Sequence, residues 1–112
     1  MVMRIAMTLD IAPDDLAPYM EAHKQVPEEV QHALTSVGIR NLSLWVWNES
    51  RMFYYAEYVG SEPFEDAMAR YAKMPGVKEW EQRMHKYQKK LPGTPEDSDV
   101  WWQPMINIVH QD

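Results

Sequence analysis

Residues 39–59 have the sequence IRNLSLWVWNESRMFYYAEYV, and the fold prediction for this chain of 112 residues starts from them. Two runs rich in aromatic and β-branched residues, Ile39 to Trp47 and Met52 to Val59, flank the short polar segment NESR. Such a pattern is typical of two antiparallel strands joined by a tight turn. We therefore expect a β-hairpin that belongs to one sheet.

Upstream of this hairpin, the sequence predicts a strand and a broken helix. Apolar residues alternate along residues 2–9, which indicates a strand with one buried face. Pro13 suits the first turn of a helix. Pro27 should interrupt or restart that helix, because its ring clashes with the preceding turn. The second piece, PEEVQHALTSVG, should end at Gly38, which can adopt a left-handed cap.

Downstream of the hairpin, the spacing of apolar residues predicts another interrupted helix. Ser61 is a suitable N-cap for a helix that begins at Glu62. Pro75 and Gly76 should interrupt it, and helical spacing then resumes from Val77 to Leu91. The proline-rich, acidic segment LPGTPEDSD is expected to be a loop.

Trp101 to Val109 is predicted as a last strand, with Pro104 confining it to an edge or a bulge. The resulting order is strand, helix, strand, strand, helix, strand. This βαββαβ order predicts a ferredoxin-like α+β fold, an antiparallel sheet with helices on one face, as a single domain over residues 1–112.

The other face of this sheet also needs a cover. Trp45 and Trp47 lie on one parity of the first hairpin strand, whereas Leu44 and Val46 lie on the other. Both faces of that strand therefore carry apolar side chains. We expect a second copy of the chain to cover the helix-free face and form a homodimer.

Composition narrows the classes of function. The 17 acidic and 11 basic residues give a net charge of −6, which argues against nucleic-acid binding as the main task. The chain has no cysteine and no apolar run of the ~18 residues that a membrane span needs. We expect a cytoplasmic protein that binds neither nucleic acid nor membrane.

Tyr19 and His23 are the first candidates for chemistry. Their spacing of four residues places a phenol and an imidazole on the same side of a helix. Histidine can exchange protons at neutral pH, and tyrosine offers a neutral hydrogen bond. The residues alone also permit an ordinary reading, in which His23 bonds a backbone carbonyl and Tyr19 belongs to the core.

Trp80 is ambiguous in a similar way, because an indole can fill a core or carry the C–H face of a sugar. Of Trp101 and Trp102, only one can line any given cavity if both lie on a strand. Glu79 and Glu81 are interpreted as solvated helix charges, and His32 and His85 as helix-surface residues. The sequence has no glycine-rich phosphate loop and no paired histidines at metal spacing, so we expect no cofactor and no metal.

Several short motifs, taken together, resemble one known family over nearly the whole chain. The sequence is similar in this way to the L-rhamnose mutarotase family of dimeric α+β barrel proteins. The matching pieces are Tyr19-x-x-x-His23, Pro27 with Glu29-Val30, Gly38, Phe53 to Glu57, Pro75 to Met84, and Trp101 to Met105.

The resemblance implies a function and a site. It implies an aldose mutarotase that interconverts the α and β anomers of a 6-deoxyhexose, in particular L-rhamnose, by acid/base ring opening. It further implies that His23 is the catalytic proton donor, that Tyr19 and Trp80 contact the sugar, and that a homodimer acts without a cofactor.

Three positions depart from the family pattern. Val26 and Leu42 stand where relatives have a tryptophan and a tyrosine, and Glu81 replaces the second tryptophan of a pair. Two alternatives stay open. One, drawn from the fold alone, is a dimeric α+β barrel monooxygenase or haem protein, with His23 or His110 as base or ligand. The other is a sugar-binding module without catalysis.

Overall fold

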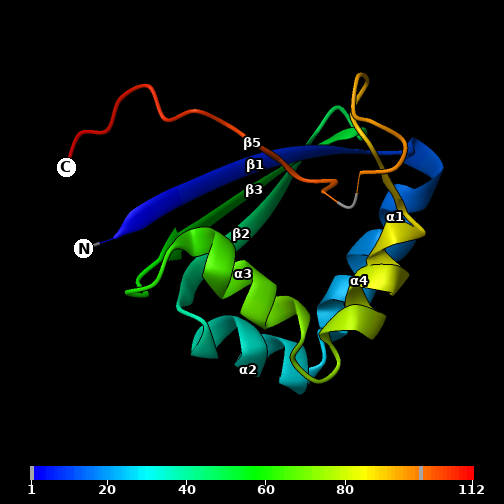
Figure 1. Ribbon diagram of the computed structural model, residues 1–112. Coiled ribbons are helices and arrows are strands. Elements are labelled where there is room, and N and C mark those ends of the chain that lie inside the picture. Colours follow the sequence, from blue (N-terminus) through cyan, green and yellow to red (C-terminus); the bar gives the residue numbers. More distant parts are fainter. Residues whose placement is uncertain (1, 99) are drawn as a thin grey trace.

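The computed structural model describes residues 2–98 and 100–112. Figure 1 shows a curled antiparallel sheet with its helices gathered on one side. The elements are β1 (Met3–Ile11), α1 (Pro13–Ala22), the 3-10 turn η1 (His23–Gln25), α2 (Glu28–Ser36), β2 (Ile39–Trp47), β3 (Arg51–Tyr58), α3 (Phe64–Ala72), α4 (Val77–His85), β4 (Gln88–Lys89) and β5 (Gln103–Pro104).

The strands pair in the order β2-β3-β1-β4, and β5 pairs with β1 next to β4. The ferredoxin-like α+β prediction is thereby confirmed. Two short segments share the position of the fourth strand: β4 pairs with Asp10 and Ile11, and β5 pairs with Met7 and Thr8.

The core lies between the sheet and the helices and has two parts. One cluster forms around Leu9 and Met52, which oppose each other across β1 and β3. The other forms around Ile5 and Ala56, the opposing pair four residues along the same ladder. Because side chains alternate between the faces of a strand, all four point to the helical side.

The opposite face of the sheet is uncovered in the single chain. Trp45 and Trp47 are each 65% exposed and alternate with Leu44 and Val46, which face the helical side. The expectation that both faces of this strand carry apolar side chains is therefore confirmed.

The start of α3 differs from the sequence prediction. Ser61 does not cap the helix; Pro63 is the N-cap residue, without a side-chain cap bond, and the helix begins at Phe64. The residue before a proline is sterically disfavoured from helical backbone angles, so the helix cannot begin at Glu62 as predicted.

The end of α4 also differs. Helical spacing predicted a helix as far as Leu91, yet α4 ends at His85. Gln88 and Lys89 instead pair with the end of β1. Tertiary strand pairing therefore overrides the helical pattern of the sequence.

The last predicted strand, Trp101 to Val109, is mostly wrong within this chain. Only Gln103 and Pro104 form strand pairs, and the Met105 N–H donates one further bond, of 2.8 Å, to the Ala6 carbonyl. Pro104 has no N–H to continue the ladder. Figure 1 shows the chain beyond it diverging from β1.

Gly38 confirms its predicted role after α2. Its φ of +104° is unfavourable for residues with a side chain, and an added Cβ would lie 2.9 Å from the Gly60 nitrogen. Gly93 has a similar φ of +90°, with nothing within 4 Å of its added Cβ. An alanine at either glycine would strain the backbone, but only an alanine at Gly38 would also clash with its surroundings.

We expect Gly38→Ala to lower the free energy of unfolding by more than Gly93→Ala does. Backbone strain of this kind costs about 1–3 kcal/mol, and Gly38→Ala adds a clash with the β3–α3 connection. Urea unfolding of both variants and the wild type measures the difference. Equal losses in the two variants would contradict this account of Gly38.

Candidate active site

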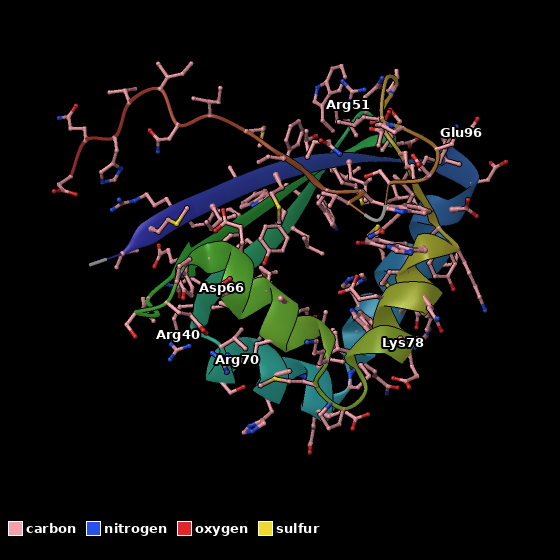
Figure 2. All side chains as sticks on the ribbon, in the orientation of Figure 1. Arg40, Arg51, Asp66, Arg70, Lys78 and Glu96 are labelled. Carbon is pink, nitrogen blue, oxygen red and sulfur yellow. The ribbon has the colours of Figure 1, made fainter. Side chains whose placement is uncertain are left out.

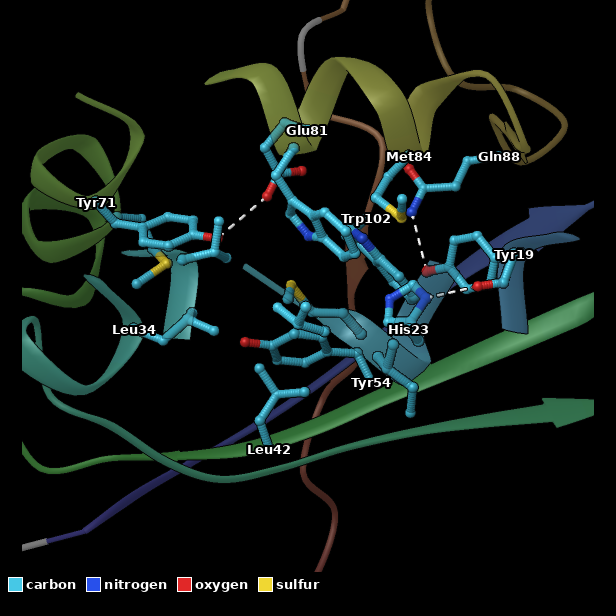
Figure 3. Close-up of a pocket in the computed structure, with 16 residues that line it drawn as sticks. Tyr19, His23, Leu34, Leu42, Tyr54, Tyr71, Glu81, Met84, Gln88 and Trp102 are labelled. Carbon is cyan, nitrogen blue, oxygen red and sulfur yellow. Dashed lines mark hydrogen bonds between the residues drawn. The ribbon is translucent and has the colours of Figure 1, made fainter. Parts of the chain in front are cut away.

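A cavity of about 220 Å³ lies between the sheet and the helices, and Figure 3 shows it in close-up. This volume is slightly below the ~300–1,000 Å³ of pockets for larger ligands, so it suits a small ring. The charged side chains labelled in Figure 2, such as Arg70 and Lys78, lie at the periphery of the molecule. Rings dominate the cavity wall: Tyr19, His23, Tyr54, Tyr71, Trp80 and Trp102.

Tyr19 and His23 come together at the end of α1. Tyr19 lies on the last turn of the helix and His23 is its C-cap residue, so the two rings lie in contact, with centroids 4.4 Å apart and their planes tilted by 45°. His23 Nδ1 lies 2.8 Å from the Tyr19 carbonyl oxygen. Because a carbonyl oxygen only accepts, Nδ1 must carry the hydrogen. Nε2 is therefore the nitrogen that can exchange a proton with a ligand.

Trp80 joins this pair from α4. Its indole is buried, and its centroid lies 5.2 Å from that of His23 in an edge-to-face arrangement. The three residues predicted for the site thus line one cavity. The ordinary reading of His23 also holds in part, since the ring does bond a backbone carbonyl.

Gln88 positions the Tyr19 hydroxyl. Gln88 Nε2 donates to Tyr19 Oη at 3.3 Å, and the Gln88 Oε1 atom is buried without a partner in the described part of the chain. Burial raises the pKa of Tyr19 above its ordinary value, although the Gln88 bond partly opposes this. Tyr19 is therefore a neutral donor at physiological pH, and Gln88 Oε1 is an acceptor that a ligand hydroxyl can satisfy.

Glu81 was misread as a solvated charge. Its side chain lines the cavity, where the Tyr71 hydroxyl donates to Glu81 Oε1 at 3.3 Å. Burial raises the pKa of Glu81, and the bond from Tyr71 partly offsets this. A signal was present in the sequence: Glu81 follows Val77 by four residues and precedes Met84 by three, so it lies on the apolar stripe of its helix.

Tyr54 and Tyr71 were also missed as cavity residues. Burial, with a smaller contribution from the Glu81 carboxylate, raises the pKa of Tyr54 to about 12. The same two causes raise the pKa of Tyr71 well above its ordinary value. Both phenols therefore stay neutral and serve as hydrogen-bond donors.

The two adjacent tryptophans line different hollows, although they do not lie on the predicted strand. Trp102 packs against Tyr54, with ring centroids 5.7 Å apart, and lines the cavity. Trp101 instead stacks on His85, with ring centroids 4.0 Å apart. His85 is therefore half-buried, whereas the sequence predicted a helix-surface residue. His32 and His110 are exposed, as predicted for the former.

Comparisons with known proteins now identify the family. Residues 4–111 match the family model described as L-rhamnose mutarotase. The chain belongs to the L-rhamnose mutarotase family. A UPF0734 protein from Dictyostelium discoideum is 31% identical over 110 residues, which cover 96% of this chain and 88% of that relative.

Solved structures share the fold of this family member. The crystal structure of an L-rhamnose mutarotase from Formosa agariphila has a TM-score of 0.74 at 20% identity, covering 98% of this chain and 99% of that one. A dimeric ferredoxin-like protein from an uncultured marine organism has a TM-score of 0.57 at 15% identity, and the match covers 97% of this chain and 91% of that one. Tetracenomycin F2 cyclase from Streptomyces glaucescens has a TM-score of 0.63 at 17% identity, and the match covers 98% of this chain and 99% of that one.

Membership of the L-rhamnose mutarotase family confirms the expected enzyme class, an isomerase that acts on a carbohydrate. It favours this reading over an oxygenase, a haem protein or a binding module.

In the part of the chain that the structure describes, no three histidine or carboxylate side chains lie close enough together to form a metal site. No helix among residues 2–98 and 100–112 combines the length and apolar character needed to span a membrane.

The three departures from the family pattern all lie on the cavity wall. Val26, Leu42 and Glu81 line it together with the predicted site residues. Relative to the aromatic residues of the pattern, this family member has shorter aliphatic side chains at two positions and an acid at the third. These three positions therefore affect the lining of the cavity directly.

Glu81→Gln should stabilise the protein at pH 7 and not at pH 4. The folded pKa of Glu81 is raised above the ordinary 4.5, so the folded protein loses stability as pH rises from 4.5 through that pKa. Each unit of the rise corresponds to about 1.4 kcal/mol. Urea unfolding at both pH values measures this difference.

Glu79→Gln is the matched control, because Glu79 is exposed on the same helix. We expect its unfolding free energy to follow that of the wild type at both pH values. A Glu81→Gln variant that is equally or less stable than the wild type at pH 7 would show that the carboxylate is not disfavoured by burial.

Proposed function

We propose that this chain interconverts the α and β anomers of a 6-deoxyhexose, with L-rhamnose as the preferred candidate, by acid/base ring opening. The observation that carries this proposal is the meeting of an imidazole, a neutral phenol and an indole on the wall of one small cavity. The family membership gives the class of substrate.

His23 is the proposed general acid. In its protonated form, Nε2 donates a proton to the ring oxygen while the anomeric hydroxyl loses its own proton. The bond between the anomeric carbon and the ring oxygen then breaks, an aldehyde forms, and rotation followed by reclosure gives the other anomer. A positioned acid or base contributes about 10² to 10⁴-fold to such a step.

The wall supports the proposal of a deoxy sugar. Trp80 and Trp102 offer aromatic surfaces for C–H groups, and Tyr19 with Gln88 offers a donor and an acceptor for hydroxyls. Leu42 belongs to an apolar part of the wall that suits a methyl group at C6. A hydroxyl at C6 placed there would be buried without a partner, which is unfavourable.

We also propose that the enzyme is a homodimer. The exposed Trp45 and Trp47 give the sheet an apolar face without helices. The C-terminal segment borders the same face, where Met105 and Ile106 line a groove with Tyr55. A second copy that covers this face removes apolar surface from water. The cytoplasmic location and the lack of nucleic-acid and membrane partners stay predictions from composition.

His23→Ala should abolish the acceleration of anomer exchange of L-rhamnose, because it removes the imidazole and leaves the cavity wall otherwise in place. Saturation-transfer NMR measures this exchange directly. His32→Ala, on the exposed face of α2, should exchange at the wild-type rate. Exchange at the wild-type rate in His23→Ala would contradict the role of His23, whereas a wild type that binds L-rhamnose without accelerating exchange would support the sugar-binding alternative.

The double variant Trp45→Ser, Trp47→Ser should be monomeric, since it removes the largest apolar side chains of the uncovered face. Sedimentation equilibrium measures the mass, and far-UV circular dichroism checks the fold. Met20→Ser is the control, because Met20 is an exposed apolar residue on α1. A dimer that survives the double substitution would place the interface elsewhere.

A further inference from the structure

The proposed ring opening needs two proton transfers, and His23 can perform one of them. A proton must reach the ring oxygen, and another must leave the anomeric hydroxyl. His23 Nδ1 is held by the Tyr19 carbonyl at 2.8 Å, so this ring has one nitrogen for exchange. A second group is therefore required, either from the chain or from water.

The titratable groups of the cavity differ in their ability to accept a proton. Burial raises the pKa of Tyr19, Tyr54 and Tyr71, so these phenols stay protonated near neutral pH and cannot act as bases. Of the described residues that line the cavity, Glu81 supplies the carboxyl group. A carboxylate accepts a proton without needing a further base.

The placement of Glu81 suits this task. Glu81 and His23 line the same cavity, and Figure 3 shows Tyr71 on the side of Glu81 and Tyr19 on the side of His23. The Tyr71 hydroxyl holds Oε1, which leaves Oε2 for a ligand. Two proton-transfer groups that line one cavity can serve the ring oxygen and the exocyclic anomeric oxygen of a small sugar at once.

We infer that Glu81 is the second catalytic residue of this enzyme, the group that exchanges the proton of the anomeric oxygen while His23 serves the ring oxygen. This inference rests on the proposed function. Glu81 stands where the family pattern has a tryptophan, a side chain that cannot take up a proton in this way. The assignment therefore concerns this chain and not the family as a whole.

The proton balance of the cycle closes without a further reactant. During opening, the Glu81 carboxylate takes the proton of the anomeric hydroxyl, and His23 Nε2 gives its proton to the ring oxygen as the bond from that oxygen to the anomeric carbon breaks. After rotation about the bond to C2, closure reverses both transfers on the other face of the aldehyde. His23 recovers its proton, and Glu81 is again a carboxylate.

The raised pKa of Glu81 supports this role, because a buried carboxylate is a stronger base than an exposed one. The groups that face it are Tyr71 from α3, Tyr54 from β3, Tyr19 from α1 and His23 from η1. On its outer side, Glu81 borders a surface groove whose other titratable residues are Lys78, His85, Lys90, Glu96 and Asp97. The exchange rate should therefore fall at low pH as Glu81 becomes protonated.

The test is the rate of L-rhamnose anomer exchange between pH 4 and pH 9, measured by saturation-transfer NMR on the whole chain. Glu81→Gln should reduce the rate about 100-fold or more and remove the fall at low pH, while L-rhamnose binding changes only a few-fold. Glu81→Asp should keep the fall at low pH. Glu79 is exposed on the same helix, so Glu79→Gln should have the wild-type rate and pH profile.

Tyr71→Phe provides a second, milder variant if Glu81→Gln does not fold. The Tyr71 bond lowers the pKa of Glu81, so its removal should raise that pKa and move the fall in rate to higher pH. A wild-type profile in Glu81→Gln, or equal losses in Glu81→Gln and Glu79→Gln, would overturn the assignment. If wild type and His23→Ala exchange L-rhamnose equally slowly, the proposed function itself fails. If the wild type accelerates exchange, His23→Ala does not, and Glu81→Gln exchanges at the wild-type rate, this inference alone fails.

Discussion

The register between β1 and β3 controls where the core ends and where the cavity begins. Leu9 opposes Met52 and Ile5 opposes Ala56, and each pair anchors one of the two core clusters. Between them, Met7 opposes Tyr54, and this pair lines the cavity. A shift of one residue would turn all these side chains to the other face. The cavity therefore lies between the two core clusters, and the β1–β3 pairing fixes its position.

Local patterns in the sequence predicted what depends on local geometry. The alternation along β1 and the hairpin determine the sheet, and the spacing of four residues places His23 beside Tyr19. The end of α4 and the last strand depend on pairing with β1, which no local pattern reports. Glu81 is a different case: its spacing from Val77 and Met84 indicated the apolar stripe of α4, whereas its contact with the Tyr71 hydroxyl on α3 could not be read from the sequence.

The solved structures with this fold include an L-rhamnose mutarotase and a polyketide cyclase, so the fold alone does not select a reaction. The chemistry must come from the lining of the cavity. The three departures from the family pattern noted in the sequence, Val26, Leu42 and Glu81, all line it. Shorter aliphatic side chains change the shape available to a sugar, and a carboxyl group changes which protons can move.

A carboxyl group on the apolar stripe of α4 is unfavourable for folding, because burial disfavours its charged form. A glutamine of similar shape could accept the same bond from Tyr71 without that penalty. Proteins keep such locally unfavourable residues mainly where function requires them. His23 shows the complementary arrangement, since the Tyr19 carbonyl fixes its tautomer and the indole of Trp80 limits its movement. An oriented imidazole and a carboxylate disfavoured by burial, both on the wall of one cavity, fit the two proton transfers of the proposed reaction.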